Sequence, residues 1–175
     1  MNLSEYIRDI PDFPREGILF RDITPLLSSP AAFNFAISKM SDLGKDLKPD
    51  VIVGIESRGF IFGIPIAMNL GLPFVPVRKK GKLPGQSLSA SYNLEYGEDS
   101  LEIHEDALSP GDSVLIVDDL IATGGTAEAA SKLVEISKGK IAAFIFVINL
   151  YDLGGCDNLI KKGHKVESLI EFPGH

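Results

Sequence analysis

The sequence has little cysteine, little histidine and no excess of positive charge, and each scarcity excludes a class of protein. A single cysteine, Cys156, excludes an intrachain disulfide framework and is typical of a reducing compartment such as the cytoplasm. The formal net charge of -7, from 17 Lys and Arg against 24 Asp and Glu, argues against a broad nucleic-acid-binding face. The three histidines are scattered, so no cluster of metal ligands is visible.

Long apolar runs are also missing. The longest, residues 141–148, falls far below the roughly 20 residues that a membrane-spanning helix needs. The N-terminus has no basic segment followed by an apolar stretch, so no secretory signal is expected. With 175 residues, 45% of them hydrophobic, the chain is expected to form one globular domain over residues 1–175, without a membrane or nucleic-acid partner.

Short apolar runs alternate with helical patterns through the middle of the chain. Near-continuous apolar strands joined by helices are typical of a parallel sheet that is covered on both faces. The predicted fold class is therefore α/β, a parallel sheet flanked by helices. The predicted strands are residues 50–55, 72–78, 114–117 and 141–148, and the predicted helices between them are 59–69 and 127–137.

Two segments depart from this alternation. Residues 1–28 are interrupted by prolines and a glycine, and they are expected to form an irregular hood. Ser29 and Pro30 then predict the N-cap and first residue of a helix. Residues 79–113 are polar and rich in turns, and they are expected to form a hairpin excursion with strands at 92–96 and 100–103. An excursion of this length in a compact domain is usually functional, often as a lid.

The most informative segment is Val114–Thr126, which reads VLIVDDLIATGGT. An apolar strand ends there in Asp118 and Asp119, and a loop of small residues leads directly into a helix. Glycines permit close backbone approach, exposed N–H groups donate to an anion, and the helix N-terminus adds a favourable dipole. This pattern predicts a phosphate-monoester site with carboxylates that accept from sugar hydroxyls. Neither a Walker motif nor G-x-G-x-x-G occurs, which disfavours NTPase and dinucleotide-binding functions.

The same string closely resembles the phosphoribosyl-pyrophosphate (PRPP) signature of the type I phosphoribosyltransferases. The resemblance implies that the acidic pair contacts the ribose 2- and 3-hydroxyls. It also implies that the following loop cradles the 5-phosphate, through Ala122, Thr123, Gly124, Gly125 and Thr126.

Three further segments narrow the resemblance to the members of this family that use adenine. The first, Phe13–Pro25, is similar to the hood segment that covers the purine. It implies base stacking on Phe20, backbone contacts from Leu19 and Arg21, and Leu120 on the other side of the base. Because any planar base can stack on an aromatic ring, Phe20 alone does not specify adenine.

The second segment, Val53–Gly63, again joins a strand end to a helix start. It is similar to the family's pyrophosphate loop, which implies anion contacts from Ser57 and Arg58. The guanidinium of Arg58 offers a planar fork of donors to phosphate oxygens. The resemblance also implies a cis peptide bond between Glu56 and Ser57.

The third segment, Val77–Gly85, carries a basic cluster in a chain that is acidic elsewhere. Such a run is usually only solvated charge, but the family uses it to bind pyrophosphate. The hairpin that follows resembles the loop that closes over the reacting centre. There Glu95 would handle the purine proton, with Tyr96 beside it. The pyrophosphate contacts that the resemblance implies are Arg78, Lys79 and Lys82.

The resemblance covers about residues 10–172 and implies transfer of the 5-phosphoribosyl group from PRPP to adenine, giving AMP and pyrophosphate in purine salvage. Arg58 and Glu95 would be the catalytic residues. Mg²⁺ would be held mainly by PRPP and pyrophosphate, and the protein would be a cytoplasmic homodimer. Asn149 departs from the pattern, because related sequences commonly carry Glu there.

Three other functions stay open at this point. The acceptor could be another purine, such as xanthine or hypoxanthine, since a few hydrogen bonds at the base edge decide the choice. A non-catalytic PRPP-binding regulator is disfavoured because such proteins often carry an added nucleic-acid-binding element or a degraded loop. A flavodoxin-like or Rossmann-like binder fits the alternation but leaves residues 78–103 unexplained.

Overall fold

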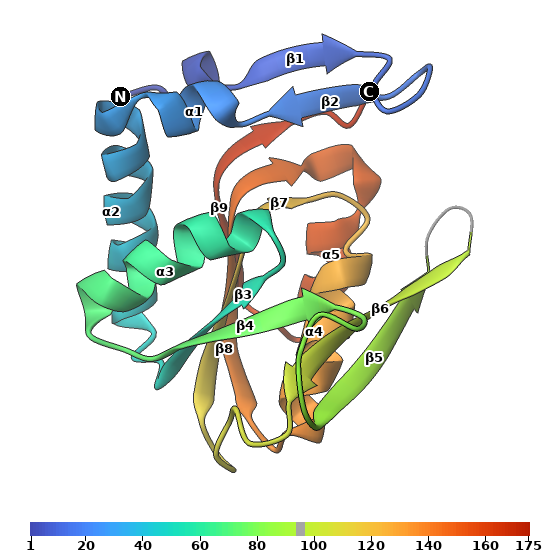
Figure 1. Ribbon diagram of the computed structural model, residues 1–175. Helices are drawn as coiled ribbons and strands as arrows, with labels where there is room; N and C mark the ends of the chain where they lie inside the picture. Colours follow the sequence, from blue (N-terminus) through green and yellow to red (C-terminus); the bar gives the residue numbers. More distant parts are fainter. Residues whose placement is uncertain (94–96) are drawn as a thin grey trace.

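The computed structural model describes residues 1–93 and 97–175, and a seven-stranded sheet forms its centre (Figure 1). The order across the sheet is β5 (Ser87–Asn93), β6 (Glu98–His104), β4 (Phe74–Lys79), β3 (Val51–Ile55), β7 (Ser113–Ile121), β8 (Lys140–Leu150) and β9 (Val166–Phe172). The five strands β4, β3, β7, β8 and β9 are parallel to one another. β6 runs antiparallel to both of its neighbours, β4 and β5.

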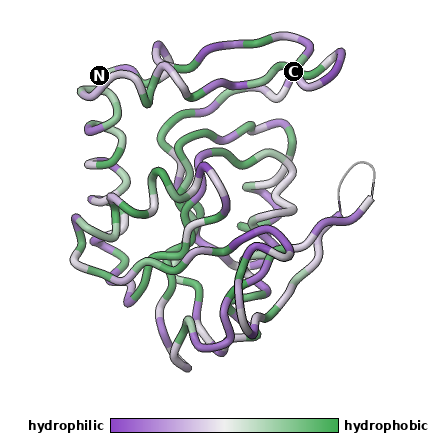
Figure 2. Tube along the Cα trace, in the orientation of Figure 1, coloured by the Kyte–Doolittle hydropathy of each residue, from purple (hydrophilic) through white to green (hydrophobic). Residues whose placement is uncertain are grey.

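Helices cover both faces of the central strands, because these strands are apolar on both sides. Leu115 and Val117 of β7 pack toward α2 (Pro30–Asp46) and α3 (Arg58–Leu70). Val114 and Ile116 pack toward α4 (Gly125–Ile136), α5 (Gly155–Lys161) and the β5–β6 hairpin. Figure 2 shows the resulting pattern, with hydrophobic residues along the central strands and more hydrophilic ones in the hairpin. The α/β prediction is therefore confirmed.

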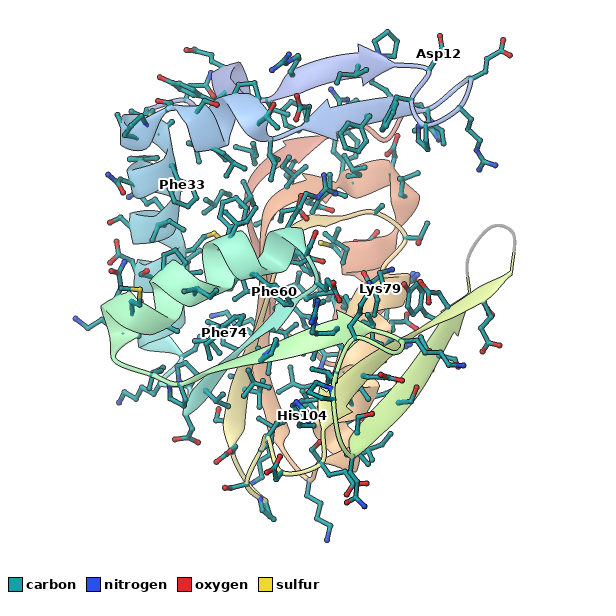
Figure 3. The ribbon with its side chains drawn as sticks, in the orientation of Figure 1. Asp12, Phe33, Phe60, Phe74, Lys79 and His104 are labelled. Carbon is teal, nitrogen blue, oxygen red and sulfur yellow. The ribbon has the colours of Figure 1, made fainter. Side chains whose placement is uncertain are left out.

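Phe74 holds α3 close to the sheet. Its ring meets Phe60 of α3 edge to face, with ring centroids 5.8 Å apart (Figure 3). A Cβ atom on Gly54 would lie 2.6 Å from this ring, and one on Gly63 would lie 2.7 Å from it. The Phe74 ring therefore fills the space that side chains at these two positions would occupy. The N-terminus of α3 is thereby held at the end of β3, where the functional site lies.

Most predicted elements are present, but several are longer than the sequence indicated. β7 continues to Ile121 and β8 to Leu150, because both are buried centrally in the sheet. The Oγ of Ser29 accepts from the backbone N–H of Ala32 at 3.3 Å, which confirms the predicted N-cap of α2. β9 was not predicted, because an edge strand of half-buried residues lacks a continuous apolar run.

The hood is more regular than predicted. It contains η1 (Leu3–Tyr6), β1 (Arg8–Pro11), β2 (Leu19–Asp22) and α1 (Thr24–Ser28). The two strands form an antiparallel ribbon separate from the main sheet, and they pair only with each other because they are short and bounded by turns. Figure 1 shows this ribbon across one end of the sheet, beside the C-terminus. In the described part of the chain, no helix is long and apolar enough to cross a membrane.

Candidate functional site

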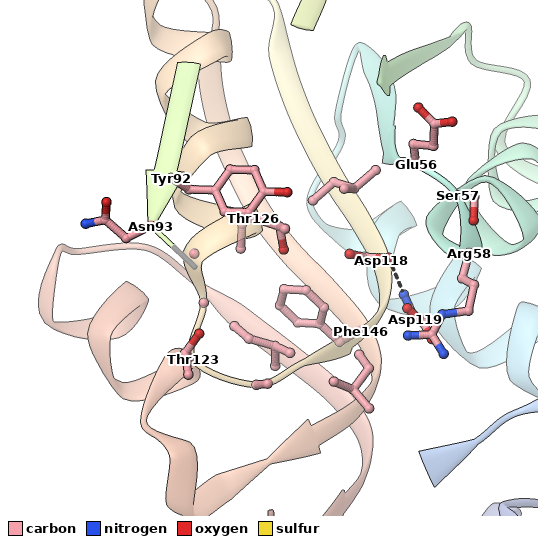
Figure 4. Close-up of a pocket in the computed structure, with 17 residues that line it drawn as sticks. Glu56, Ser57, Arg58, Tyr92, Asn93, Asp118, Asp119, Thr123, Thr126 and Phe146 are labelled. Carbon is pink, nitrogen blue, oxygen red and sulfur yellow. Dashed lines mark hydrogen bonds and ion pairs between the residues drawn. The ribbon is translucent and has the colours of Figure 1, made fainter. Parts of the chain in front are cut away.

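A pocket of about 420 Å³ lies where β3 and β7 lead into α3 and α4 (Figure 4). Both strands are parallel and end at the same edge of the sheet, which is where open α/β sheets bind ligands. The pocket thus brings together the two strand-to-helix segments that the sequence analysis selected. Its lining residues are Ile55, Glu56, Ser57, Arg58, Tyr92, Asn93, Asp118, Asp119, Leu120, Ile121, Ala122, Thr123, Gly124, Gly125, Thr126, Ala127 and Phe146.

Asp118 and Asp119 lie inside β7. The sequence suggested that the strand ends at these residues, but it continues to Ile121. Only 9% of Asp118 and 3% of Asp119 is exposed. Burial raises the pKa of both carboxyls; the charge of Asp119 raises that of Asp118 further, and the Arg58 guanidinium opposes the shift of Asp119. Two carboxyls in such surroundings are costly to ionise together, so the pair has a strong demand for donors such as ligand hydroxyls.

Arg58 lies between this acidic pair and the hood. Its Nε is 3.0 Å from Oδ2 of Asp119, but that oxygen is buried and has no aligned hydrogen-bond donor. The guanidinium carbon is also 5.5 Å from the centroid of the Phe20 ring. Arg58 therefore connects the predicted base-binding hood to the predicted ribose site, with a side chain that is still 39% exposed.

The loop Ala122–Gly125 is shaped by backbone packing. Gly124 is in the left-handed region with φ of +91°, and it leads into α4. A Cβ on Gly124 would lie 3.1 Å from the Cα of Gly155, and one on Gly125 would lie 3.6 Å from the backbone oxygen of Asn93. Thr123 and Thr126 line the pocket beside them (Figure 4). The first N–H groups of a helix lack intrahelical partners, so this turn can donate to an anion.

The other turn carries charged side chains. The peptide bond between Glu56 and Ser57 is cis, as the family resemblance implied. The carboxylate of Glu56 accepts from Nη2 of Arg78 at 3.1 Å and from the backbone N–H of Lys79 at 2.7 Å. Although burial acts in the opposite direction, these hydrogen bonds lower the pKa of Glu56 below its usual value. Glu56 is therefore an anion that ties this turn to the end of β4.

The basic cluster does not line the pocket of its own chain. Arg78 donates to Glu56 and, at 3.3 Å, to the backbone oxygen of Lys82. Nζ of Lys79 lies 3.0 Å from Oδ2 of Asp99 and also donates to the hydroxyl of Tyr92. Figure 3 shows Lys79 beside the β5–β6 hairpin, and its two partners form a cross-strand pair near the turn end of that hairpin. A pyrophosphate role for Arg78, Lys79 and Lys82 stays a prediction.

The hood places its predicted residues above the pocket, but the side chain of Arg21 is already engaged. It is buried, pairs with Asp9, and donates through Nη2 to the backbone oxygen of Pro173 at 2.9 Å. The side chain therefore has its partners within the protein, and a base contact through the backbone of Arg21 stays a prediction. Phe20 packs edge to face on Phe13, with centroids 5.1 Å apart. Glu95 and Tyr96 lie outside the described residues.

Two features that sequence reasoning missed support the site from behind. Gly155, far along the chain, contacts the loop Ala122–Gly125 directly. Tyr92 lines the pocket from β5, where the sequence analysis assigned it no role. A glycine in a turn carries no local signal of what its missing side chain would have met.

Asn149, which departs from the family pattern, is buried. Its Nδ2 donates to Oε1 of Glu171 at 3.2 Å, while its Oδ1 has no hydrogen-bond partner among the described residues.

Comparison with known proteins gives one family. Residues 23–171 match the model of the phosphoribosyl transferase domain. The adenine phosphoribosyltransferase of Pelagibacter ubique (strain HTCC1062) is 57% identical over 175 residues, which is 100% of both chains. The adenine phosphoribosyltransferase of Escherichia coli O157:H7 is 52% identical over 173 residues, covering 99% of this chain and 94% of that one.

Solved structures agree. The adenine phosphoribosyltransferase from Thermoanaerobacter pseudethanolicus has a TM-score of 0.93 at 50% identity, covering 98% of this chain and 100% of that one. The Saccharomyces cerevisiae protein, complexed with an imino-altritol bisphosphate and adenine, has a TM-score of 0.88 at 43% identity, covering 96% of each chain. Sequence, fold and pocket lead to the same conclusion: the chain belongs to the phosphoribosyl transferase family and, within it, to the adenine phosphoribosyltransferases.

Proposed function

We propose that this protein transfers the 5-phosphoribosyl group from PRPP to adenine, giving AMP and pyrophosphate for purine salvage. The observation that carries the proposal is the buried acidic pair of β7, which stands between two strand-to-helix turns at one edge of the sheet. A phosphorylated sugar with a second anionic group matches that arrangement. Family membership over the whole chain favours adenine over the alternative acceptors and over a regulator.

Asp118 and Asp119 accept the ribose 2- and 3-hydroxyls in this proposal. Both side chains are buried and Oδ2 of Asp119 has no aligned donor in the described part of the chain, so two hydroxyl groups would supply donors without adding charge. The 5-phosphate lies on the loop that follows the acidic pair. Its donors are the backbone N–H groups at the start of α4 and the hydroxyls of Thr123 and Thr126, so an anion is held without a lysine or arginine. The loop residues in contact with the phosphate are Ala122, Thr123, Gly124, Gly125 and Thr126.

Arg58 and Ser57 face the leaving pyrophosphate. As the bond from ribose C1 to pyrophosphate breaks, negative charge grows on the leaving oxygen, and a fixed cation at that place lowers the barrier. Glu56 holds this turn in place through Arg78 and Lys79. We assign Arg78, Lys79 and Lys82 to the same pyrophosphate. Arg78 contacts Glu56, which lines the pocket, so the cluster adjoins the turn that carries Arg58.

Adenine binds under the hood, stacked near Phe20, with Leu120 on its other face and the backbone of Leu19 and Arg21 at its edge. The cation–π contact between Arg58 and Phe20 fixes the ring beside the reacting centre. Glu95 hydrogen-bonds the purine and handles its proton as the base attacks ribose C1, and Tyr96 acts beside it in the hairpin.

Mg²⁺ would enter with PRPP. Within residues 1–93 and 97–175, no group of three His, Cys, Asp or Glu side chains is placed to hold a metal ion. The oxygen-rich acidic pair still fits such an ion, because Mg²⁺ usually keeps several waters and binds through phosphates plus one or two carboxylates. Asp118 and Asp119 would face its water ligands. Bound in this way, Mg²⁺ supplies neutralisation of the pyrophosphate charge.

We also propose a cytoplasmic homodimer. The single half-buried cysteine suits a reducing compartment. Ile64 and Met68 lie one turn apart on α3 and are 44% and 77% exposed, which gives that helix an apolar strip suited to a subunit contact. Sedimentation velocity of the purified chain tests the assembly, and a monomer at micromolar concentration would contradict it.

The decisive experiment is adenine-dependent release of pyrophosphate from PRPP in the presence of Mg²⁺. AMP formation with adenine, and none with hypoxanthine or xanthine, is the expected result. Turnover with another purine would reassign the acceptor, and PRPP binding without turnover would identify a regulator. Glu95→Gln should lower kcat far more than it weakens PRPP binding. An unchanged kcat would remove Glu95 from the mechanism.

A further inference from the structure

The loop proposed to bind the 5-phosphate rests on a turn from much further along the chain. This turn runs from η2 (Tyr151–Leu153) into the first residue of α5. The backbone N–H of Gly155 donates to the carbonyl oxygen of Ala122 at 3.0 Å. Gly155 is itself buried, so the contact is closed to water. One backbone hydrogen bond therefore joins the turn to the first residue of the loop.

The two segments are in direct backbone contact. A Cβ on Gly155 would lie 2.4 Å from the oxygen of Ala122 and 2.8 Å from the backbone nitrogen of Gly124. On the opposite side of the contact, a Cβ on Gly124 would lie 3.1 Å from the Cα of Gly155. The two glycines are thus back to back; a Cβ on Gly155 would also lie 2.8 Å from Cγ1 of Ile121, but its shortest contact is with backbone, which cannot move aside as a side chain can. Any side chain at position 155 has to displace the loop.

The turn is held from behind, so it has little freedom to retreat. The backbone N–H of Gly174 donates to Oδ1 of Asp152 at 2.6 Å. The side chain of Leu153 fills the space where a Cβ of Gly174 would be, at 2.6 Å to 2.8 Å. The preceding residue, Pro173, accepts from Arg21 of the hood. A substitution at position 155 would therefore move the loop before it moved the turn.

We propose that Gly155 is a positioning residue for the 5-phosphate: its missing side chain sets the position of the loop Ala122–Gly125 and so the direction of the loop's N–H donors. The inference rests on the proposed function, because it assigns the phosphate to this loop. It also changes the explanation of Gly124. From the sequence, the glycines are explained by close approach of a ligand, whereas in the structure Gly124 is favoured by its positive φ and by its tight contact with Gly155.

The test compares Gly155→Ala, at the first residue of α5, with Gly163→Ala, just beyond the end of the same helix. Gly163 has a positive φ of 89° with nothing within 4 Å of its missing Cβ, so its substitution strains the backbone without touching the loop. The dissociation constants of adenine and of AMP are measured by calorimetry for both variants and the unmodified protein. Because AMP carries the 5-phosphate and adenine does not, the ratio of the two constants reports the contribution of the ribose phosphate.

For Gly155→Ala, the affinity for AMP should fall at least tenfold while the affinity for adenine stays within twofold. Gly163→Ala should leave both affinities unchanged, even if the melting temperature falls. Unchanged AMP binding in folded Gly155→Ala would overturn the inference, and so would an equal loss for both ligands, which indicates general damage. If the unmodified protein binds neither adenine nor AMP, the proposed function fails instead.

If Gly155→Ala does not fold, the unmodified protein supplies the test. In an NMR titration, the amide resonance of Gly155 should shift when AMP binds, because the phosphate fixes the loop that its N–H contacts. Adenine alone should leave that resonance in place. A Gly155 resonance that is insensitive to AMP would show that the turn does not respond to phosphate binding, and the proposal would be wrong.

Discussion

The two strand-to-helix turns that line the pocket differ in composition and in the interactions that hold them. The turn after β7 consists of small uncharged residues and owes its shape to backbone contact with Gly155. The turn after β3 consists of charged side chains, with Glu56 bound to Arg78 and Arg58 beside Asp119. Both lie at one edge of the sheet and both suit an anion.

The difference predicts how each turn can fail. A backbone-built site depends on shape, so it should be sensitive to added volume and insensitive to salt. A site built from ion pairs tolerates small changes in volume, but its charges are screened and can be titrated. The acidic pair of β7 lies between the two turns and should matter to both. The following predictions test this contrast, from the largest expected effect to the smallest.

Removal of both buried carboxylates should have the largest effect. In the double variant Asp118→Asn and Asp119→Asn, the ribose hydroxyls lose two buried carboxyl acceptors. We expect PRPP affinity, measured by calorimetry, to fall by about a hundredfold or more. Asp42→Asn on the exposed face of α2 is the control and should bind normally. Near-native PRPP affinity in the double variant would undo the ribose assignment.

Gly59→Ala should increase the distance between the two turns. A Cβ there would lie 2.7 Å from the backbone oxygen of Val117 and 3.0 Å from Oδ1 of Asp118, so α3 is pushed away from β7. Added volume at such a packed contact costs about 1–3 kcal/mol of unfolding free energy. Chemical denaturation should show this loss, together with a drop in kcat/KM of at least tenfold. A fully active variant would show that the spacing between the turns is unimportant.

Glu56→Gln should affect only the charged turn. The pKa of Glu56 is lowered in the folded state, so its stabilising contribution is present above the unfolded pKa and is lost as the pH falls through the lower, folded value. Denaturation at pH 7 should show a loss of about 1–2 kcal/mol, which disappears in acid.

The same variant should raise the KM for PRPP at low salt, and the difference from the unmodified protein should shrink in 0.5 M salt. Gly155→Ala is the matched comparison, because its defect should not depend on salt. Equal salt dependence in the two variants would contradict the contrast between a charged turn and a backbone-built turn.

Asp118→Asn alone should give the smallest effect, a gain in stability. The folded pKa of Asp118 lies well above the unfolded value, so its contribution to folding is complete below the unfolded pKa and is lost as the pH rises through the folded one. At pH 8 the melting temperature of the variant should exceed that of the unmodified protein by about 2–4 °C, as roughly 1 kcal/mol would produce. The advantage should vanish toward pH 3, and an advantage independent of pH would refute the assigned cause.

Much of the site could be predicted from short contiguous strings. The segment Val114–Thr126 carries its strand, its carboxylates and its loop in order, and the carboxylates and the loop line the pocket. The Ser29 N-cap and the helix over Arg58–Leu70 were also readable, because capping and apolar periodicity are local properties. Where the sequence was misleading, the reason was tertiary: β7 continues past its apolar run because β8 pairs with Leu120 and Ile121.

The basic cluster shows the limit of composition as a guide. Its residues are prominent in an acidic chain, yet Lys79 and Arg78 are engaged by Asp99, Tyr92 and Glu56. The sequence cannot show such partners, because they come from other strands. Arg21 is a second case, since its burial against Asp9 and Pro173 leaves only the backbone for a ligand.

The sequence by itself determined the chemistry at the ends of β3 and β7, since a strand, a turn and a helix start are specified by neighbours along the chain. Only the tertiary structure decided what holds those turns in place. Strand order brings Gly155 against Gly124, Glu56 against Arg78, and the hood strand against Pro173. Hydrogen bonds between residues a few positions apart follow from the local sequence, whereas close packing between distant segments forms only once the sheet has assembled.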